Sequence, residues 1–215
     1  MKEMSGAPDQ TVYIVDDDEA LRDSLVWLLE SNSYRVAQFD SAEVFLAAYR
    51  PEMAGCLVLD VRMPGMSGLE LYERLRDRHA TLPVVFITGH GDVPMAVSVL
   101  KKGAVDFIEK PFTDRDMLKL IDQCLATERE NRERLRQDAA VARRLDQLTG
   151  REMEVLELII AGRLNKQIAD DLGISIKTVE VHRARVMEKM EAGSLAELVQ
   201  AVMSCETARG RFSTL

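Results

Sequence analysis

Long apolar segments and paired cysteines are both missing from this sequence of 215 residues. No stretch reaches the roughly eighteen consecutive apolar residues that a transmembrane helix needs, and the N-terminal segment lacks the apolar region of a secretory signal peptide. The three cysteines, Cys56, Cys124 and Cys205, lie far apart and lack metal-ligand spacing, which is typical of reduced thiols. We therefore expect a cytoplasmic protein that contacts no membrane.

Motifs of several enzyme classes are missing as well. The sequence contains no Walker-type phosphate loop, no HExxH zinc motif and no GxSxG nucleophile turn. Nucleotide hydrolases, metalloproteases and serine hydrolases depend on these motifs for their chemistry. The absences disfavour all three classes.

Charge and turn residues divide the chain. Residues 1–127 carry 13 basic and 21 acidic side chains, a net charge of −8, whereas residues 128–215 carry 15 of each. An acidic first part favours a cation as ligand over a polyanion. All six prolines lie within the first 111 residues, and the absence of proline and glycine from 112 to 149 is typical of a long helix. The sequence thus predicts a first domain at 10–127, a helical linker at 128–147 and a second domain at 148–208.

Short β-rich runs alternate with helix-period segments in the first part. The predicted strands are residues 12–15, 34–39, 56–59, 84–88 and 105–108. The predicted helices are residues 19–31, 42–49, 69–78 and 95–102, with a fifth from 114 onward. Strict alternation of strands and helices predicts an α/β domain in which a parallel sheet is covered on both faces.

The linker helix, residues 112–148, has two interpretations. Its middle carries Glu–Arg pairs four residues apart, such as Glu128 with Arg132, which support an exposed helix. A narrow apolar stripe runs along one side and consists of Leu135, Ala139, Ala142 and Leu145. The helix is therefore either a solvated connector or a short coiled-coil seam between two copies.

Four shorter helices are expected in the last part of the chain. Thr149 and Glu152 form a capping box at the start of the first, and Ser175 caps the third. Gly173 stands in the turn between the second and the third helix. This succession predicts a small all-α domain that contains a helix-turn-helix pair.

Polar side chains follow four of the five predicted strands. They are, in chain order, Asp16 to Asp18, Asp60, Thr88 and Lys110. Because the carboxyl ends of parallel strands meet at one edge of the sheet, we expect these side chains to converge there. Such a group of charges at one edge is a candidate functional site.

The chemistry of this group suits phosphoryl transfer. Converging carboxylates need a counter-charge, and Mg²⁺ takes oxygen ligands while it keeps positions for water and phosphate oxygens. Asp60, on the central strand, is placed to act as the nucleophile and form an acyl phosphate. Lys110 can pair with the phosphoryl group, and Thr88 can donate a hydrogen bond to it. The sequence therefore predicts a Mg²⁺-dependent phosphoacceptor site.

The motifs around these residues resemble those of a known family. The segments IVDDDE, LVLDVRMPGMSG, ITGHGDVPMA and GAVDFIEKPF are similar to the receiver domain of two-component response regulators. The stretch from Leu148 to Met190 resembles a LuxR-type helix-turn-helix domain. Together the two cover nearly the whole chain and are similar to the NarL/FixJ subfamily, on the FixJ side. The resemblance implies a flavodoxin-like receiver with a five-stranded parallel sheet, then the long linker helix and a four-helix DNA-binding domain.

The resemblance also implies roles for single residues. Asp60 would be the phosphoacceptor, and Thr88 and Phe107 would be switch residues that remodel the face of the fourth helix, fifth strand and fifth helix. Lys110 would contact the phosphate and precede a cis peptide bond to Pro111. The implied Mg²⁺ ligands are Asp16, Asp17, Asp60 and the main-chain carbonyl of Arg62.

In the helical domain, the resemblance makes Ser175 to Met190 the recognition helix of the major groove. Helical spacing turns Val179 and Val186 inward. Glu180 and Val181 can read base edges, whereas the lysines suit phosphates. The expected DNA contacts are Lys166, Ser175, Lys177, Thr178, Glu180, Val181, Arg183, Ala184, Arg185 and Lys189.

The resemblance implies a transcriptional regulator whose partners are a sensor histidine kinase, promoter DNA and RNA polymerase. Phosphorylation is expected to pair two receivers into a homodimer, which doubles the DNA contacts and favours action as an activator. An enzyme of the haloacid dehalogenase type would need a second Asp two residues after Asp60, where Arg62 stands, so the chain is not expected to be an enzyme. A phospho-switched module whose helical tail binds protein or RNA stays open as an alternative.

Overall fold

The computed structural model describes residues 10–89 and 106–205. It divides into two compact units, a first unit of Met1–Arg132 and a second unit of Glu133–Leu215. The helix predicted at 95–102 lies outside the described residues, as do Val105 of the fifth predicted strand and residues 206–208 of the second predicted domain.

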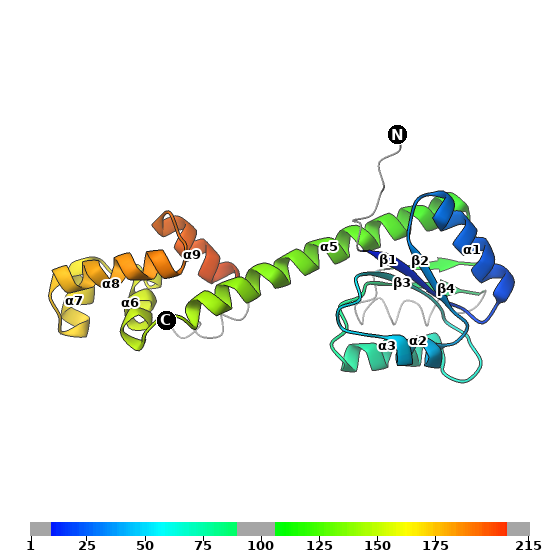
Figure 1. The fold of residues 1–215 in the computed structure, drawn as a ribbon, viewed down its shortest axis with the longest axis horizontal. Helices are drawn as coiled ribbons and strands as arrows, with labels where there is room; N and C mark the ends of the chain where they lie inside the picture. Colours follow the sequence, from blue (N-terminus) through cyan, green and yellow to red (C-terminus); the bar gives the residue numbers. More distant parts are fainter. Residues whose placement is uncertain (1–9, 90–105, 206–215) are drawn as a thin grey trace. The chain divides into compact units, whose positions relative to one another are not determined.

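The first unit is built on a parallel sheet with the strand order β2-β1-β3-β4-β5 (Figure 1). The strands are β1 (Thr11–Val15), β2 (Val36–Phe39), β3 (Gly55–Asp60), β4 (Val84–Thr88) and β5 (Asp106–Glu109). Every residue of β3 and β4 is buried, as the continuous apolar runs CLVL and VVFI require of strands covered on both faces. The predicted α/β fold is confirmed.

Helices cover both faces of the sheet. They are α1 (Glu19–Ser31), α2 (Ala42–Ala48), α3 (Gly68–Asp77) and the beginning of α5 (Asp114–Leu145). Side chains alternate along each strand, so Leu57 and Leu59 of β3 pack in one core cluster with α2 and α3, and Val58 packs in another with α1 and α5. Figure 1 shows α2 and α3 on one side of the sheet and α1 with α5 on the other.

The second strand is shorter than predicted. The expected range began at residue 34, but β2 begins at Val36. Tyr34 is buried, and its hydroxyl donates to Asp122 Oδ1 of α5 at 2.6 Å. Tyr34 therefore lies before β2 and anchors the chain to α5 instead of belonging to the strand.

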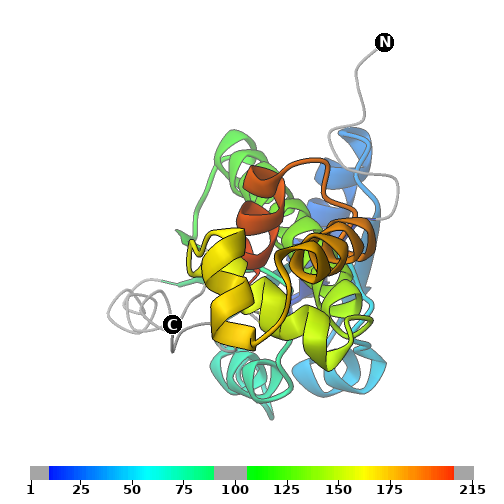
Figure 2. The same ribbon diagram turned by 90° about the vertical axis from the view of Figure 1, so that its left-hand side faces the viewer.

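In the described part of the second unit, up to Cys205, four short helices follow α5. Figure 2 shows them from the end of the ribbon. They are α6 (Gly150–Ile160), α7 (Asn165–Leu172), α8 (Ile176–Lys189) and α9 (Leu195–Ser204). Gly173 ends α7 with a φ of 65°, a backbone conformation that favours glycine. The predicted all-α domain and the turn at Gly173 are confirmed.

The predicted linker at 128–147 is shared between the two units. At its beginning, Gln10 Nε2 donates to the buried Glu128 at 2.5 Å and to the carbonyl of Leu125 at 2.8 Å, which ties α5 to the start of β1. Near its end, Val141 and Leu145 are buried in the core of the second unit. Leu145 is thus unavailable to the coiled-coil seam that was one of the two interpretations of this helix, because it packs inside its own domain.

The three cysteines are free and buried. Within residues 10–89 and 106–205, no helix has both the length and the apolar character that crossing a bilayer demands.

Candidate functional site

The carboxyl edge of the sheet carries a pocket of about 230 Å³. It is lined by Asp16, Asp17, Asp18, Asp60, Arg62, Gly89 and Lys110. The structure thus brings together side chains that follow β1, β3 and β5. Thr88 does not line this pocket, but the next residue in the chain, Gly89, does.

Lys110 connects two of the carboxylates. Its Nζ lies 2.7 Å from Asp60 Oδ1 and 3.2 Å from Asp16 Oδ2. Its main-chain N–H donates to the carbonyl of Thr88 at 2.8 Å, which fixes the segment after β5 beside the end of β4. Partial burial lowers the pKa of Lys110, but the two carboxylates outweigh this effect and leave its pKa raised. Lys110 is therefore a cation held in place by Asp16 and Asp60.

Asp60 is only 6% exposed, and both of its carboxylate oxygens have partners. Oδ1 faces Lys110, and Oδ2 accepts a hydrogen bond from the main-chain N–H of Arg62 at 2.7 Å. Burial raises the pKa of Asp60, and the hydrogen bond from Lys110 counters that rise. The carboxylate is thus desolvated, oriented and kept beside a cation, as a nucleophile requires.

Asp16 is fixed from several sides. Its Oδ1 accepts from the N–H of Asp18 at 2.8 Å, and Arg22 donates to its main-chain carbonyl at 2.8 Å. Asp18 caps α1 by accepting from the N–H groups of Ala20 and Leu21, so its carboxylate serves the helix. Arg22 was not predicted, because nothing in the spacing of the sequence indicates its contact with Asp16.

Gly68 is a second residue that sequence reasoning missed. A Cβ at this position would lie 2.0 Å from the main-chain oxygen of Asp60. The first turn of α3 can therefore approach the end of β3 only because the residue is glycine. The available signal was a glycine directly after the N-cap Ser67, where a helix has no need of one.

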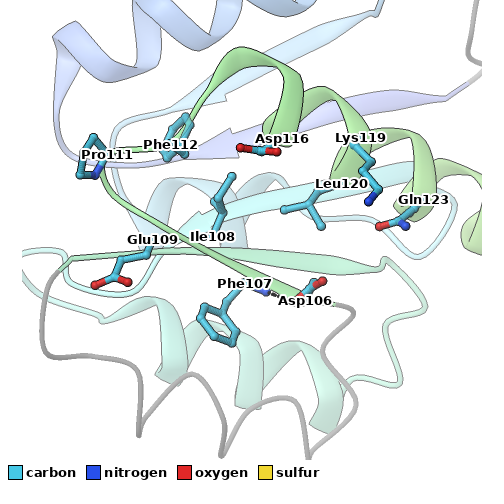
Figure 3. Close-up of a pocket in the computed structure, with 10 residues that line it drawn as sticks. All are labelled: Asp106, Phe107, Ile108, Glu109, Pro111, Phe112, Asp116, Lys119, Leu120 and Gln123. Carbon is cyan, nitrogen blue, oxygen red and sulfur yellow. Dashed lines mark hydrogen bonds between the residues drawn. The ribbon is translucent and has the colours of Figure 1, made fainter.

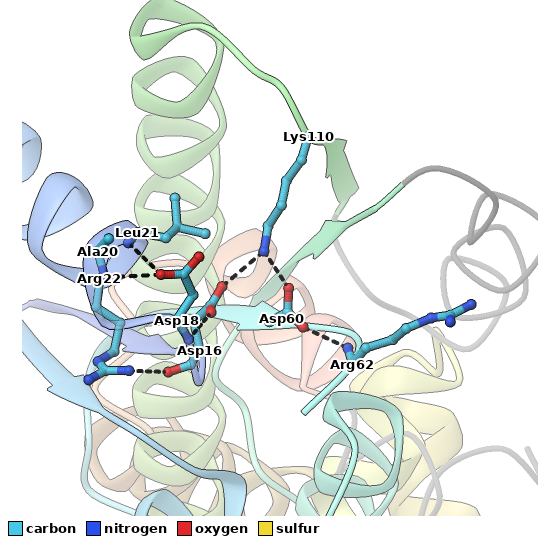
Figure 4. A network of polar contacts seen from close by, with 8 residues as sticks. All are labelled: Asp16, Asp18, Ala20, Leu21, Arg22, Asp60, Arg62 and Lys110. Atoms are coloured by element: carbon cyan, nitrogen blue, oxygen red, sulfur yellow. Dashed lines mark hydrogen bonds and ion pairs between the residues drawn. The ribbon is translucent and has the colours of Figure 1, made fainter. Parts of the chain in front are cut away.

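The donor atoms at this edge suit Mg²⁺ in kind, because all of them are oxygens. Among the described residues, however, no three acidic, histidine or cysteine side chains already converge closely enough to enclose an ion. The ammonium group of Lys110 lies between Asp16 and Asp60 instead (Figure 4). Asp17 is exposed at the rim of the pocket. The site therefore offers suitable oxygen ligands, but these ligands are not yet arranged around a metal position.

The two implied switch residues differ in their surroundings. Thr88 is fully buried, and its hydroxyl has no hydrogen-bond partner among the described residues. Phe107 is half-buried and pairs in register with Phe86 of β4, and it packs against the cluster that contains α2 and α3. The peptide bond between Lys110 and Pro111 is cis, as the resemblance implied.

A hollow of about 400 Å³ lies along β5 and the first turns of α5 (Figure 3). Phe107 and Ile108 point to opposite sides of β5, and both contribute to its lining. Asp106, Glu109, Asp116 and Lys119 give it a charged rim. Two of its lining residues, Glu109 and Pro111, are the sequence neighbours of Lys110.

In the second unit, α8 presents a polar face. Val179 and Val186 are fully buried, as predicted. Of the expected DNA contacts, those that are exposed are Lys166, Ser175, Lys177, Thr178, Glu180, Val181, Ala184 and Arg185. Ser175 also caps α8 by accepting from the N–H of Thr178 at 3.1 Å. Arg183 and Lys189 are half-buried.

Lys189 has a partner inside its own domain. Its Nζ lies 2.6 Å from Glu152 Oε2 and 3.1 Å from the carbonyl of Gln147. Glu152 is only 2% exposed and also accepts from the N–H of Thr149 at 2.9 Å in the capping box of α6. The hydrogen bonds from Lys189 and Thr149 lower the pKa of Glu152 to about 2. Lys189 thus joins the end of α8 to the beginning of α6.

The fold and the site define a class of protein. A five-stranded parallel domain with an aspartate, a lysine and a buried hydroxyl at its carboxyl edge is followed by a helix-turn-helix domain. Comparison with protein families agrees with this division: the response regulator receiver domain matches residues 12–122, and the luxR family of bacterial regulatory proteins matches residues 146–202.

Whole-length relatives share both domains. The chain is 48% identical over 192 residues to the transcriptional regulatory protein FixJ of Azorhizobium caulinodans, which covers 89% of this chain and 91% of that protein. Among solved structures, the response regulator StyR has 47% identity and a TM-score of 0.81 and covers 91% of this chain and 98% of its own. Full-length FixJ from B. japonicum has 42% identity and a TM-score of 0.58 and covers 94% and 99%.

The chain belongs to the two-component response regulators of the NarL/FixJ subfamily, in which a receiver domain is joined to a LuxR-type DNA-binding domain. The receiver domain implies a sensor kinase as partner, and the LuxR-type domain implies DNA.

Proposed function

We propose that a sensor histidine kinase phosphorylates this protein on Asp60 in a Mg²⁺-dependent reaction, and that phosphorylation promotes dimerisation and promoter binding. The observation that carries the proposal is the buried Asp60 carboxylate at the end of the central strand, with Lys110 2.7 Å away. The pocket beside Asp60 gives a phosphoryl group access to this carboxylate, which a purely structural ion pair would not require.

The reaction transfers a phosphoryl group between two side chains. A carboxylate oxygen of Asp60 attacks phosphorus, the bond from phosphorus to the imidazole nitrogen of the kinase breaks, and an acyl phosphate forms. Mg²⁺, held by Asp16, Asp17, Asp60 and the carbonyl of Arg62, supplies positive charge for the phosphoryl oxygens when bound. Lys110 pairs with one of these oxygens and orients the group for in-line transfer.

Thr88 then couples the phosphoryl group on Asp60 to a change at the protein surface. Its buried hydroxyl, unpartnered in the described part of the chain, donates to a phosphoryl oxygen. The movement of Thr88 lets the half-buried Phe107 turn inward, which changes the hollow along β5 and α5 (Figure 3). Two copies pair through this changed surface, and the homodimer presents two helix-turn-helix domains to one site on DNA.

The output is transcription of a target promoter. Exposed residues of α8, chiefly Lys177, Glu180, Val181 and Arg185, enter the major groove, and Lys166 contacts a phosphate. The name of the FixJ relative as a transcriptional regulatory protein supports this assignment. Bound to DNA, the dimer recruits RNA polymerase and acts as an activator.

A selection from random double-stranded DNA tests the proposal. The full chain is incubated with acetyl phosphate and Mg²⁺, and its mass in solution is measured by light scattering before the selection. We expect a dimer that enriches a two-fold symmetric sequence, whereas Asp60→Asn stays monomeric and enriches little. Phosphorylated dimers that enrich no DNA would favour the alternative output, a helical tail that binds protein or RNA.

A further inference from the structure

The loop from β3 to α3 contacts a side chain that the phosphoacceptor site does not otherwise include. This loop, residues 61–67, begins directly after Asp60 and contains Arg62. In its second half, the main-chain N–H of Met66 donates to Glu43 Oε1 of α2 at 2.8 Å. Glu43 thus reaches across from a helix 23 residues earlier in the chain and holds the loop by its backbone.

The neighbouring Gly65 makes room for this contact. Its φ is +75°, and a Cβ at this position would lie 2.7 Å from Glu43 Oε1. Any larger residue would therefore push against the same carboxylate oxygen that accepts from Met66. Two separate features of the loop, the N–H of Met66 and the missing side chain of Gly65, fit one carboxylate.

Each end of the loop also has contacts of its own. At the first end, the N–H of Arg62 donates to Asp60 Oδ2 at 2.7 Å. At the other end, the N–H of Gly68 donates to the carbonyl of Val61 at 3.1 Å, and Ser67 caps α3. The contact from Glu43 holds the backbone of the loop at Met66, between these two ends.

We infer that Glu43 is a positioning residue of the phosphoacceptor site. By holding Met66, it restrains the loop so that the main-chain carbonyl of Arg62 keeps its place at the edge of the pocket. The inference rests on the proposed function, in which that carbonyl is a ligand of Mg²⁺. Removing a group that hydrogen-bonds directly to a metal ligand typically changes metal affinity by about 10- to 100-fold. Glu43 acts one step further away, through the backbone between Met66 and Arg62, so we expect an effect at the lower end of that range.

Glu43 has one other effect that an experiment must separate. It lies in the first turn of α2, where its negative charge favours the helix. Removing that charge could by itself alter the attraction of the acidic pocket for a cation. A glutamine at this position keeps an oxygen that accepts from Met66 but removes the charge, so it separates the two effects.

Three variants of the full chain test the inference: Glu43→Ala, Glu43→Gln and, as a control on the same turn of α2, Val44→Ala, whose side chain is 51% exposed. Exchange of the Met66 amide hydrogen is followed by NMR in metal-free protein, and Mg²⁺ affinity is measured by calorimetry. In Glu43→Ala we expect exchange to be faster and Mg²⁺ affinity to fall by about tenfold. Glu43→Gln and Val44→Ala should stay close to the wild type in both measurements.

Two outcomes overturn the inference. If Glu43→Ala exchanges faster at Met66 but binds Mg²⁺ as the wild type does, the contact holds the loop without serving the site. If Glu43→Gln loses as much affinity as Glu43→Ala, the charge is responsible and not the contact. Failure of the proposed function gives a different result, because the wild type itself would then bind no Mg²⁺ whatever happens at Met66.

Discussion

The ammonium group of Lys189 lies 2.6 Å from the buried carboxylate of Glu152, so the last turn of α8 is joined to the first turn of α6. The sequence suggested that Lys189 contacts a DNA phosphate, but its charge already has a partner in the domain. We therefore expect Lys189 to contribute to the stability of the domain more than to DNA contact.

Replacing Glu152 with Gln is expected to lower the free energy of unfolding of the second unit by about 1–3 kcal/mol, because Lys189 loses its charged partner. The pKa of Glu152 is lowered from 4.5 to about 2 in the folded protein. Stabilisation by the ionised carboxylate is therefore complete above the ordinary pKa and is lost as the pH falls from about 4.5 toward 2. Urea unfolding followed by circular dichroism should show that the free energies of unfolding of the wild type and of Glu152→Gln converge as the pH falls across that range. A difference that does not change with pH would contradict this account.

Lys177 and Lys189 are expected to behave differently when each is replaced by Ala. Lys177 is exposed on α8, so its loss should weaken DNA binding and reduce the slope of log affinity against log salt by about one. Lys189→Ala should instead lower stability and leave the salt slope nearly unchanged. Binding measured by fluorescence anisotropy at several salt concentrations checks both. Equal reductions in slope would make Lys189 a phosphate contact after all.

Asp60→Asn is expected to stabilise the first unit at neutral pH by about 0.5–2 kcal/mol. Burial raises the pKa of Asp60 above 3.8, so the folded protein holds this proton more tightly than the unfolded chain does. The ionised carboxylate consequently costs stability at pH 7, and that cost disappears as the pH falls through the folded pKa. Thermal unfolding of Asp60→Asn and of the exposed neighbour Asp17→Asn measures the effect. Destabilisation of Asp60→Asn at pH 7 would show that its charge supports the fold.

Thr88→Val should separate phosphorylation from its consequence. Valine has the shape of threonine, and the hydroxyl that it removes has no partner in the described part of the chain, so stability should stay the same or rise. The acyl phosphate should still form on Asp60, but dimerisation should be lost, whereas Thr88→Ser should retain it. Light scattering of the phosphorylated proteins gives the answer. Normal dimerisation of Thr88→Val would remove Thr88 from the switch.

Much of the site could be predicted because its chemistry follows from strand order. Asp16 and Lys110 come directly after strands and Asp60 is the last residue of β3, and in a parallel sheet these positions share one edge. Capping signals are local, so the beginnings of α6 and α8 and the turn at Gly173 were predicted correctly. Tyr34 misled the prediction of β2, because an aromatic residue suits a strand and a helix contact equally well.

What could not be predicted depends on contacts between distant parts of the chain. Glu43 and Met66 are 23 residues apart, and Glu152 and Lys189 are 37 apart, so no periodicity connects them. In both pairs the carboxylate also has a local explanation, a first-turn charge or a capping box, that hides its second partner. The division of the predicted linker between two cores was hidden for the same reason, since Leu145 fits a surface stripe as well as a core.

The most direct test of the account is the intact mass of the protein after incubation with acetyl phosphate, with and without Mg²⁺. We predict that one phosphoryl group is added only when Mg²⁺ is present, and that Asp60→Asn acquires none. Addition that is independent of Mg²⁺, or that persists in Asp60→Asn, would contradict the assignment of this carboxylate as the phosphoacceptor.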